Sequence, residues 1–426
     1  MEDITVILIH YEEQSMLSKA LSSLKKISSR IKSVLVLHDE KTVLHINNHM
    51  DFDAKLSFIK TGVGGTGGAL NETIGELSAS FVLFLQDTDY LSPLLNNASL
   101  VMPQSISVLR TGLHHRNSVS HFPVLVRTSM LKKHKFLSKN QLPFQEALLP
   151  AWLSTIDQSQ QQMAGNLLKQ ARKNSSVDTI EKFQFMQKYQ LPKTNLNTPT
   201  ISVVIAIYNM EKYVETAIAS CLLQAEQFDE ILIMDDGSTD SSYKQLAKWG
   251  DGKQVKTFHK KNEGKAKALN ELLPHVTSDF ILELDGDDWL DYDACSMIKR
   301  HAAGLADTIS VLYGNFRRWK QLPNDILYKG VTNGKAVNGK ADLLHYRFPL
   351  GPRIYRTSLL KEAGGFPVID FENGRLFEDV SVLFQLLKRS QFQYKDFTIY
   401  NVREHKQSIT KTNDAKWSLF LKKLTE

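Results

Sequence analysis

The sequence is poor in cysteine and contains no long apolar run. Its two cysteines, Cys221 and Cys295, cannot build a disulfide framework and do not stand in a metal-ligand pattern, so we expect a reducing compartment. The longest apolar stretches, such as Ile231–Met234, have the length of a strand and fall far short of a bilayer span. The opening residues Met1–Asp3 have neither the basic start nor the apolar core of a secretory signal. These absences predict a cytoplasmic location.

The chain also has only a small excess of positive over negative charge. The formal net charge of +6 over 426 residues suits an anionic ligand or a membrane surface, and we expect no nucleic acid among the partners. Hydrophobic residues make up 42% and charged residues 23% of the chain, a globular composition that excludes a disordered protein. The length exceeds one ordinary core and suits two domains or one large domain.

Predicted strands and helices alternate along most of the chain, which is typical of a sheet flanked by helices. The strands of the second half are continuously apolar, as in Ile231–Met234, which favours a parallel sheet that is buried on both faces. The strands that we predict there are 201–207, 230–234, 255–259 and 280–284, with helices over 211–223 and 265–273. The expected fold class is therefore α/β.

The first half repeats the order of the second half. Ile4–Tyr11 lines up with Ile201–Tyr208, and Phe81–Leu85 lines up with Phe280–Leu284. Because the offsets are nearly constant along the series, we predict a tandem duplication. The expected domains are a first domain over 1–157, a helical linker over 158–198, and a second domain over 199–426 that ends in a helix.

Acidic residues follow two predicted strands of the second half. Asp235 and Asp236 end one strand, and Asp285–Asp288 follows another. Ligands of open parallel sheets bind beyond the carboxyl ends of the strands, and crowded carboxylates need a cation or hydrogen-bond donors. Each group taken singly also fits a turn, a helix cap or a solvated loop. A calcium loop fits poorly, because Trp289 and Leu290 stand where that motif needs an oxygen ligand and a glycine.

These residues belong to a longer series that resembles the family 2 glycosyltransferases over about residues 199 to 410. The series comprises Ser202–Asn209, Asp235–Asp240, Asn262–Asn270, Asp285–Asp287, Gly364–Phe366 with Phe377–Asp379, and Arg403–His405. The resemblance implies two GT-A-like domains and a metal-dependent, inverting transfer of a sugar from a nucleotide-diphosphate donor, most often a UDP-sugar. A Gln-x-x-Arg-Trp motif is absent from the sequence, which predicts a non-processive enzyme.

The resemblance also assigns a donor site and a metal ion, Mn²⁺ or Mg²⁺. By that resemblance Asp287 holds the ion, together with Asp285 and the late histidine His405. Leu269 stands where many members carry arginine, which leaves Lys265 or Lys267 as the cation that meets the diphosphate. Ala206 stands where members of the family frequently carry proline. The residues assigned to the donor are Ala206, Tyr208, Asn209, Asp235, Asp236, Gly264, Lys265, Lys267, Asp285 and Gly286.

On the acceptor side, the resemblance implies that Asp379 is the general base and that Gly365, Phe366 and Glu378 bind the acceptor. A hydroxyl is a poor nucleophile until a carboxylate removes its proton, and a divalent cation stabilises the departing diphosphate. Glu378 also fits a helix N-terminal charge. The acceptor stays open among a glycan, a lipid-linked sugar and a protein.

The first half lacks several of these residues. Its counterpart of Asp285–Asp288 is Gln86–Asp89, in which glutamine and threonine replace the residues expected to touch metal or ribose. We therefore predict a degenerate domain without turnover that positions the acceptor, supports a dimer or braces the second half. Gly62–Gly67 formally fits a dinucleotide-binding pattern, but it aligns with Asn262–Asn270, and we interpret it as a loop inherited from the duplication.

The C-terminal stripe and the cellular role leave alternatives open. Trp417, Phe420, Leu421 and Leu424 have helical spacing beside lysines, which fits an anionic membrane surface, a second copy of the chain, or the protein's own core. The layout of the whole chain also resembles a spore-maturation protein, which implies a role in spore-surface or cell-surface glycan assembly. The rival hypotheses are a nucleotide-sugar-binding pseudoenzyme that acts as a scaffold, and a nucleotidyltransferase or phosphohydrolase that uses the same aspartates.

Overall fold

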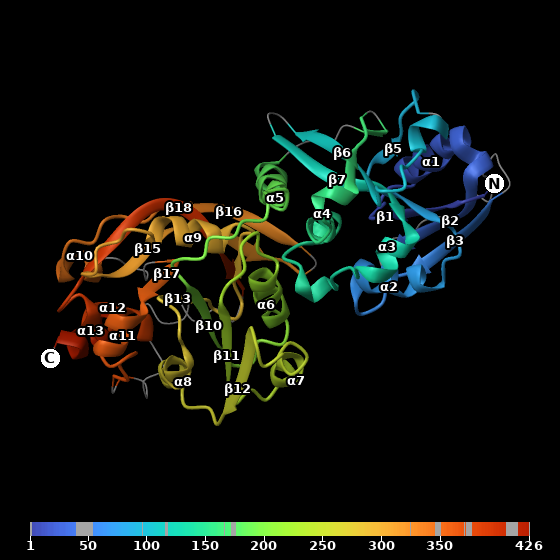
Figure 1. Ribbon diagram of the computed structural model, residues 1–426. Coiled ribbons are helices and arrows are strands. Elements are labelled where there is room, and N and C mark those ends of the chain that lie inside the picture. The colour runs from blue at the N-terminus through green and yellow to red at the C-terminus, as the bar shows by residue number, and fades with distance from the viewer. Residues whose placement is uncertain are drawn as a thin grey trace. The chain divides into compact units, whose positions relative to one another are not determined.

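The computed structural model divides into two compact units, unit 1 over Met1–Gln190 and unit 2 over Leu191–Glu426 (Figure 1). It describes residues 2–39, 54–95, 97–115, 118–165, 167–171, 176–323, 325–345, 351–369, 371, 377–405 and 416–425. Each unit contains a mixed sheet with helices packed against it, which confirms the predicted α/β class. Among the described residues, the helices are too short or too polar for any of them to cross a membrane.

Unit 1 is built on a seven-stranded sheet of order β3-β2-β1-β4-β7-β6-β8. The strands β3, β2, β1 and β4 run parallel, and β7 is antiparallel to β4 and to β6. Their bounds are β1 Ile4–Ile9, β2 Ile31–His38, β3 Lys55–Lys60, β4 Phe81–Gln86, β6 Val108–His115, β7 Ser118–Arg127 and β8 Gln161–Met163. A separate pair is formed by β5 Asp89–Leu91 and β9 Leu168–Gln170.

Helices of unit 1 bury the apolar strands. Leu17 and Ala20 of the first helix pack with Val6, Leu8 and Val36 of the sheet in one buried cluster. The helices are α1 Gln14–Ser23, α2 Gly65–Glu76, α3 Thr128–Lys133, α4 Leu148–Ser154 and α5 Val177–Lys188. Within 158–198, β8 pairs with β6 and β9 with β5, so this part of the chain belongs to the fold of unit 1 as far as Gln190.

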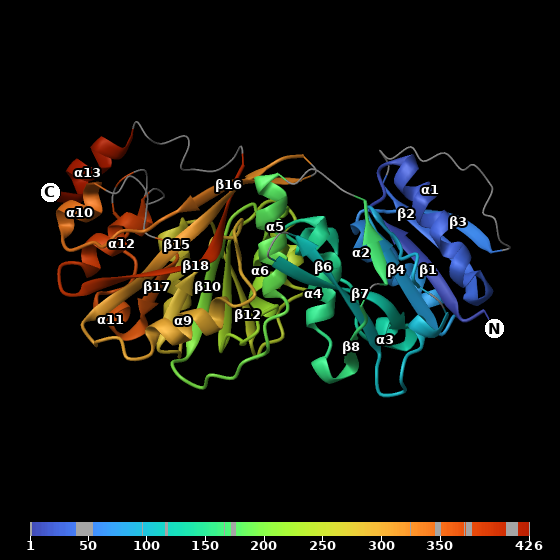
Figure 2. The same cartoon turned by 90° about the horizontal axis from the view of Figure 1, so that it is seen from above.

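Unit 2 contains a nine-stranded sheet, whose main path is β12-β11-β10-β13-β17-β15-β18-β14 with β16 paired to β15 (Figure 2). The strands β12, β11, β10 and β13 run parallel, and β17 is antiparallel to β13. Their bounds are β10 Ile201–Ile207, β11 Glu230–Asp236, β12 Val255–Lys260, β13 Phe280–Glu283, β14 Trp289–Leu290, β15 Ile309–Gln321, β16 Ile326–Thr332, β17 Arg353–Arg356 and β18 Gln391–Glu404.

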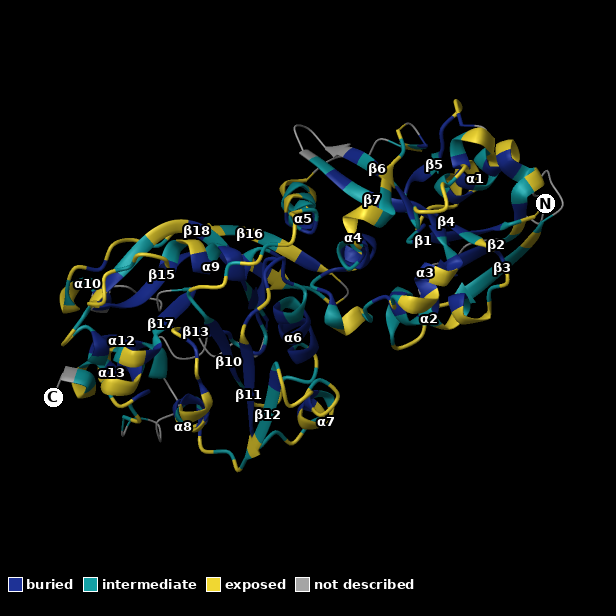
Figure 3. Cartoon of the chain, viewed as in Figure 1, coloured by how far each residue is buried: buried dark blue, intermediate teal, exposed yellow. Residues whose placement is uncertain are grey.

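Two buried clusters cover the two faces of this sheet, and the central strands are buried along their length (Figure 3). One cluster contains α6 Val214–Leu222, α7 Ser242–Leu246 and α9 Ala294–Ala302, and the other contains α8 Lys265–Leu272, α10 Lys340–His345, α11 Thr357–Glu362 and α12 Glu378–Leu386. Coverage of both faces explains why the parallel strands are continuously apolar. The last helix, α13 Trp417–Thr425, buries Phe420 completely and packs Leu424 against the second cluster, so its apolar stripe serves the core of unit 2.

The two units share strand order and register. The path β3-β2-β1-β4-β7-β6 of unit 1 corresponds to β12-β11-β10-β13-β17-β15 of unit 2. Ile4 pairs with Phe81 as Ile201 pairs with Phe280, and the antiparallel neighbour places an arginine opposite each phenylalanine. Matching registers across six strands support the tandem duplication that the sequence predicts.

A side-chain clamp recurs at the same place in both units. In unit 1, Asn71 Nδ2 donates to the Phe136 carbonyl at 2.9 Å, and Phe136 N donates to Asn71 Oδ1 at 2.8 Å. In unit 2, Asn270 makes the same two bonds with Phe366, at 2.8 and 2.7 Å. Each clamp satisfies the backbone of a segment outside regular structure, so it fixes that segment against α2 or α8.

Replacing the clamp asparagine should destabilise only the unit that contains it. Asn270→Ala leaves the Phe366 N–H and C=O without their partners, which we expect to cost unit 2 about 2–4 kcal/mol. Hydrogen exchange followed peptide by peptide should show the loss in unit 2 for Asn270→Ala and in unit 1 for Asn71→Ala. Asn338→Ala, which removes an exposed side chain, is the control. Equal exchange in all three variants would contradict the clamp.

Candidate functional site

The candidate site lies at the carboxyl ends of the parallel strands of unit 2. Asp235, at the end of β11, is fully buried, and its Oδ2 lies 2.7 Å from His259 Nδ1 and accepts from Ser238 N at 3.2 Å. Its Oδ1 is buried and has no hydrogen-bond partner among the residues that the structure describes. A buried acceptor without a partner is costly, so this oxygen is suited to accept an N–H group from a ligand.

Asp236, the second aspartate of the pair, has a different role. Its two carboxylate oxygens accept the backbone N–H groups of Glu263 at 2.9 Å and Gly264 at 2.8 Å. Gly237, which follows β11, has a φ of +71°. A Cβ at this position would lie 2.6 Å from the backbone nitrogen of Asn262, in the loop before α8. Asp236 therefore fastens the loop before α8, and its oxygens are already engaged.

The end of β10 is tied to the loop after β11. Asn209 has a left-handed backbone with φ +55°, its N–H donates to Ser238 Oγ at 2.9 Å, and its Oδ1 accepts from Thr239 N at 2.8 Å. The preceding side chain, Tyr208, is 44% exposed, whereas Ala206 packs against the second core cluster. Tyr208 and Asn209, which follow β10, are both exposed, whereas Ala206 on the strand is not.

A buried carboxylate, Glu283 at the end of β13, is the centre of an ionic cluster. It is 1% exposed and accepts from Arg353 Nε and Nη2 at 3.0 Å each and from the Tyr355 hydroxyl at 2.9 Å. Lys265 Nζ lies 2.8 Å from its Oε1. Burial pushes the pKa of Glu283 upward, but the charges of Arg353 and Lys265 outweigh burial and hold that pKa well below its usual value.

The two cations of this cluster reach further carboxylates. Lys265 Nζ lies 2.5 Å from Asp285 Oδ1 and 3.3 Å from Glu378 Oε1. Arg353 lies 3.6 Å from Asp285 Oδ2 through Nη2 and 3.6 Å from Asp379 Oδ2 through Nη1. Lys265 and Arg353 thus join a residue assigned to the donor with the acidic pair assigned to the acceptor, although 94 positions separate Asp285 from Asp379 in the sequence.

Burial raises the pKa of both carboxyls of the acidic pair at the start of α12. Burial raises the pKa of Glu378 to about 7, while the charge of Lys265 lowers it and that of Asp379 raises it. Burial also raises the pKa of Asp379, against the opposing charge of Arg353. A more basic carboxylate takes a proton from a hydroxyl more readily once it is ionised.

The C-terminal part of β18 holds the loop that follows β13. Tyr400 accepts the N–H of Asp285 at 3.0 Å, and the backbone N–H of Arg403 donates to Asp288 Oδ1 at 2.7 Å. Arg403 Nε donates to the Asp287 carbonyl at 2.8 Å, and its guanidinium lies over the rings of Tyr213 and Trp289. Gly286 is required in this loop, because a Cβ would lie 2.7 Å from Ile207 Cγ2.

Two residues of this loop region fit a divalent cation. Asp287 Oδ2 and His405 Nε2 lie 2.8 Å apart, close to the roughly 3 Å that separates neighbouring ligands on an ion with bonds of about 2.1 Å. Asp285, also assigned to the metal, has its carboxylate in contact with Lys265 and Arg353. Within the described ranges, no group of three or more His, Cys, Asp and Glu side chains is arranged to hold an ion. Asp287 and His405 would therefore supply two of the ligands that such an ion needs.

The remaining assigned residues lie nearby but have structural contacts. Phe366 is buried in the second core cluster and Gly365, with φ +80°, faces the amide of Asn270. Lys267 is half-exposed and pairs with Glu263 at 3.2 Å. Sequence reasoning missed Glu283, Arg353, Tyr355 and Tyr400, and only the charge of Glu283 within an otherwise apolar strand could have signalled the cluster.

In unit 1 the positions of Glu283, Arg353 and Lys265 carry uncharged residues. The shared register places Phe84 at the position of Glu283 and Val124 at that of Arg353, and Thr66 aligns with Lys265. Phe84 and Val124 are buried, and Phe84 packs edge-on against Phe136. Apolar side chains have replaced Glu283 and Arg353, whereas Thr66, whose Oγ1 lies 3.1 Å from His10 Nε2, stands in place of Lys265.

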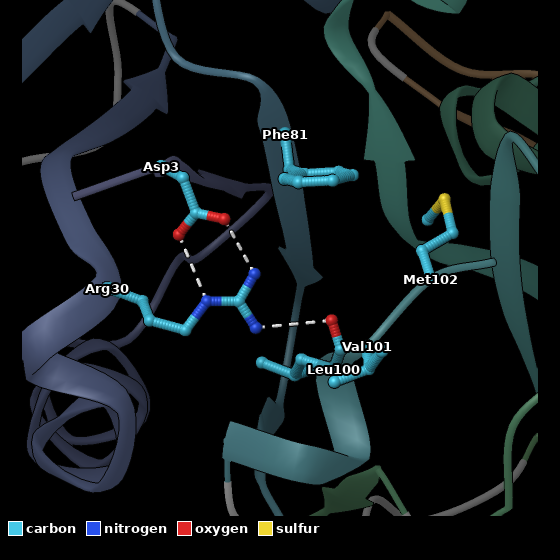
Figure 4. Close-up of a pocket in the computed structure, with 6 residues that line it drawn as sticks. All are labelled: Asp3, Arg30, Phe81, Leu100, Val101 and Met102. Carbon is cyan, nitrogen blue, oxygen red and sulfur yellow. Dashed lines mark hydrogen bonds and ion pairs between the residues drawn. The ribbon is translucent and has the colours of Figure 1, made fainter. Parts of the chain in front are cut away.

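The cavity described in unit 1 lies elsewhere (Figure 4). It has a volume of about 390 Å³ and is lined by Asp3, Arg30, Phe81, Leu100, Val101 and Met102. Arg30 is paired with Asp3 and donates to the Leu100 carbonyl. Asp3 precedes β1 and Phe81 begins β4, so the cavity is at the amino ends of the strands and is not the counterpart of the site in unit 2.

Asp89 of unit 1 corresponds to Asp288 of unit 2, and burial makes both carboxyls weak acids. Burial raises the pKa of Asp89 from 3.8 to about 7. The folded state therefore holds this proton more tightly than the unfolded state, and its stabilising contribution is complete below pH 3.8 and lost as the pH rises to about 7.

We expect unit 1 to lose stability between these pH values through Asp89, by an amount on the order of 4 kcal/mol. Hydrogen exchange in β5 and β9, corrected for the intrinsic effect of pH, measures this loss. Asp89→Asn should flatten the pH dependence, whereas Glu72→Gln, at an exposed position of α2, should leave it unchanged. An unaltered slope in Asp89→Asn would contradict this assignment.

The chain is similar to known glycosyltransferases. Residues 202–363 match the family model Glycosyl transferase family 2. An uncharacterized glycosyltransferase of Haemophilus influenzae is 32% identical over 186 residues, which are 43% of this chain and 72% of that protein. The putative glycosyltransferase EpsH of Bacillus subtilis is 31% identical over 121 residues, which are 28% of this chain and 35% of EpsH. The match thus spans about a third of EpsH.

Among solved structures, Staphylococcus aureus TarS 1–349 in complex with UDP-GlcNAc is 20% identical with a TM-score of 0.38, and the match covers 50% of this chain and 61% of that one. A TM-score this low supports no inference about function. The match to the family model and the identity over most of the Haemophilus protein show that this chain belongs to the family 2 glycosyltransferases.

Proposed function

We propose that unit 2 is a metal-dependent, inverting and non-processive glycosyltransferase that moves a sugar from a nucleotide-diphosphate donor to a hydroxyl. The observation that carries the proposal is the ionic cluster of Glu283, Lys265 and Arg353. Arg353 lies 3.6 Å from both Asp285, assigned to the donor, and Asp379, assigned as the base, and Lys265 pairs with Asp285. Transfer requires donor and acceptor to meet at one point, and this cluster supplies a fixed place for both.

In this proposal Asp379 removes the proton of the acceptor hydroxyl. Its carboxylate is oriented by Arg353 Nη1 at 3.6 Å and accepts from Val380 N at 2.8 Å. The raised pKa of Asp379 makes it a stronger base than an exposed aspartate. Glu378, held by Lys265, binds the acceptor beside it. Attack on the face opposite the leaving diphosphate inverts the anomeric centre.

On the donor side, Asp287 and His405 are the residues that would hold Mn²⁺ or Mg²⁺. Such an ion, when bound, stabilises the negative charge that develops on the leaving diphosphate. Arg403 holds the Asp287 backbone through its carbonyl, and its guanidinium lies 4.9 Å from the Tyr213 ring and 4.8 Å from the Trp289 ring. Imidazole with carboxylate is a ligand pair that suits Mn²⁺ better than Ca²⁺.

We favour a UDP-sugar as the donor. Asp235 Oδ1 is a single buried acceptor, and uracil offers one ring N–H between two carbonyl groups, whereas guanine offers a row of donors. The family resemblance also favours UDP. Tyr208, exposed at the end of β10, is placed to cover the base. The acceptor that we propose is a glycan, lipid-linked or protein hydroxyl in spore-surface or cell-surface glycan assembly.

We further propose that unit 1 performs no transfer. Phe84, Val124 and Thr66 at the cluster positions support this, because they cannot orient a catalytic carboxylate. Unit 1 then positions the acceptor, supports a dimer or braces unit 2.

Asp379→Asn should lower the turnover of a UDP-sugar by about 10²–10⁴-fold with Mn²⁺ present, because the hydroxyl or water loses its base. UDP affinity, measured by calorimetry, should stay unchanged. Asp307→Asn, at a fully exposed position of unit 2, is the matched control. Release of UDP identifies a transferase, whereas pyrophosphate or phosphate would identify the nucleotidyltransferase or phosphohydrolase. Binding without turnover in the parent chain would favour the scaffold.

Loss of the metal ligands should remove the effect of Mn²⁺ on donor binding. In the parent chain we expect UDP with Mn²⁺ to raise the melting temperature of unit 2 more than UDP alone, because a ligand of the native state adds to its stability. Asp287→Asn and His405→Ala should abolish the increment due to Mn²⁺ and leave that due to UDP. An increment that survives in both variants would place the ion elsewhere.

A further inference from the structure

The C-terminal helix α13 packs its aromatic side chains on the residue that precedes the candidate catalytic pair. The ring of Phe377 lies 4.7 Å from that of Phe420 and 5.2 Å from that of Trp417, measured between centroids. Phe371 completes the group at 5.6 Å from Phe420 and 6.3 Å from Phe377. These four rings form what we name the aromatic clasp. It joins two segments that are 40 residues apart in the sequence.

Phe377 has an unfavourable backbone conformation. Its φ of 61° and ψ of 29° are in the left-handed region, although it is neither glycine nor asparagine. A conformation of this kind costs about 1–3 kcal/mol and persists only where the surroundings compensate for it. Contacts between aromatic rings contribute about 0.5–1.5 kcal/mol each beyond burial, so the clasp can offset the cost.

The conformation of Phe377 sets the direction of the first turn of α12. Its carbonyl accepts from Ser381 N at 3.0 Å and from Ser381 Oγ at 2.8 Å, which begins the helix. Glu378 and Asp379 are the first two residues of that helix. Since side chains leave a helix in directions fixed by its backbone, rotation at Phe377 would move both carboxylates away from Lys265 and Arg353.

The clasp is anchored on the core of unit 2. Phe420 is fully buried, and Leu424 one turn later packs against the second core cluster. The other face of α13 has Leu419 at 64% exposure and the exposed residues Lys422 and Lys423. The helix therefore has one face that holds Phe377 and another that can be changed without disturbing the clasp.

We propose that α13 is a positioning element of the active site: through Phe420 and Trp417 it holds Phe377 left-handed and so keeps Asp379 oriented toward the acceptor. This inference rests on the proposed role of Asp379 as the base. Misplacement of a reacting group by about 1 Å can cost on the order of 10²-fold in rate. Loss of the clasp should therefore act on turnover, while the donor site at the ends of β10 and β11 keeps its geometry.

The decisive variant is Phe420→Ala, with Leu419→Ala on the exposed face of the same helix as its control. With UDP-glucose or UDP-N-acetylglucosamine and Mn²⁺, we expect Phe420→Ala to lower kcat by about 10–100-fold. The Kd for UDP should stay within about twofold of the parent value, since no clasp residue contacts Asp235 or Asp287 in the described structure. Phe420→Leu should restore much of kcat, because an apolar side chain of similar volume still packs on Phe377.

Hydrogen exchange tests the same inference without turnover. In Phe420→Ala the amide of Ser381, which is bonded to the Phe377 carbonyl, should exchange faster, whereas in Leu419→Ala it should not. If Phe420→Ala does not fold, Trp417→Ala, which removes a partly exposed ring of the clasp, replaces it in both measurements.

The outcomes separate this inference from the proposed function. Unchanged kcat and unchanged Ser381 exchange in Phe420→Ala would overturn the role of α13, even if Asp379→Asn is inactive. An equal loss of kcat and UDP affinity would also overturn it, because it indicates general destabilisation. Full activity of Asp379→Asn would instead overturn the proposed function.

Discussion

The buried carboxylate of Glu283 is the constraint on which the site of unit 2 depends. A charge that is 1% exposed is tolerable only when it is paired and hydrogen-bonded, and Arg353, Lys265 and Tyr355 meet that need. Once Arg353 and Lys265 are fixed in the interior, their remaining N–H groups need acceptors as well. Lys265 has Asp285 and Glu378 within 3.3 Å, and Arg353 forms looser ion pairs with Asp285 and Asp379 at 3.6 Å. One buried charge thus draws two cations and three further carboxylates into one cluster.

The cluster also contains more carboxylates than cations. Four carboxylates, of Glu283, Asp285, Glu378 and Asp379, share the two cations Lys265 and Arg353. Glu283 lies within 3.0 Å of both cations, which hold its pKa down, whereas burial raises the pKa of both carboxyls of the acidic pair on α12. Carboxylates in one cluster are thereby divided into a structural anion and more basic groups suited to proton transfer.

Much of this arrangement was predictable from sequence, and the rest depended on tertiary contacts. The apolar strands, their parallel order and the duplication follow from local patterns, and so does the acidic loop after Phe280–Glu283. The pairing of Asp236 with backbone N–H groups could not be predicted, because it depends on a loop 27 residues away. Arg353 was missed for a similar reason. It reaches Glu283 only because β17 runs antiparallel beside β13, a register that no local motif specifies.

The apolar counterpart of the cluster in unit 1 has a consequence for how the two halves diverged. Removing one partner of a buried ion pair leaves the other charge unpaired, which costs about 3–5 kcal/mol of stability. Replacing both partners by well-packed apolar residues changes the stability little. A chain that lost Glu283 alone, or Arg353 alone, would have passed through a markedly less stable form. Phe84 and Val124 of unit 1 are such a buried apolar pair at the positions of Glu283 and Arg353. For the same reason, few stable intermediates lie between a unit whose buried centre is fully charged and one whose centre is apolar.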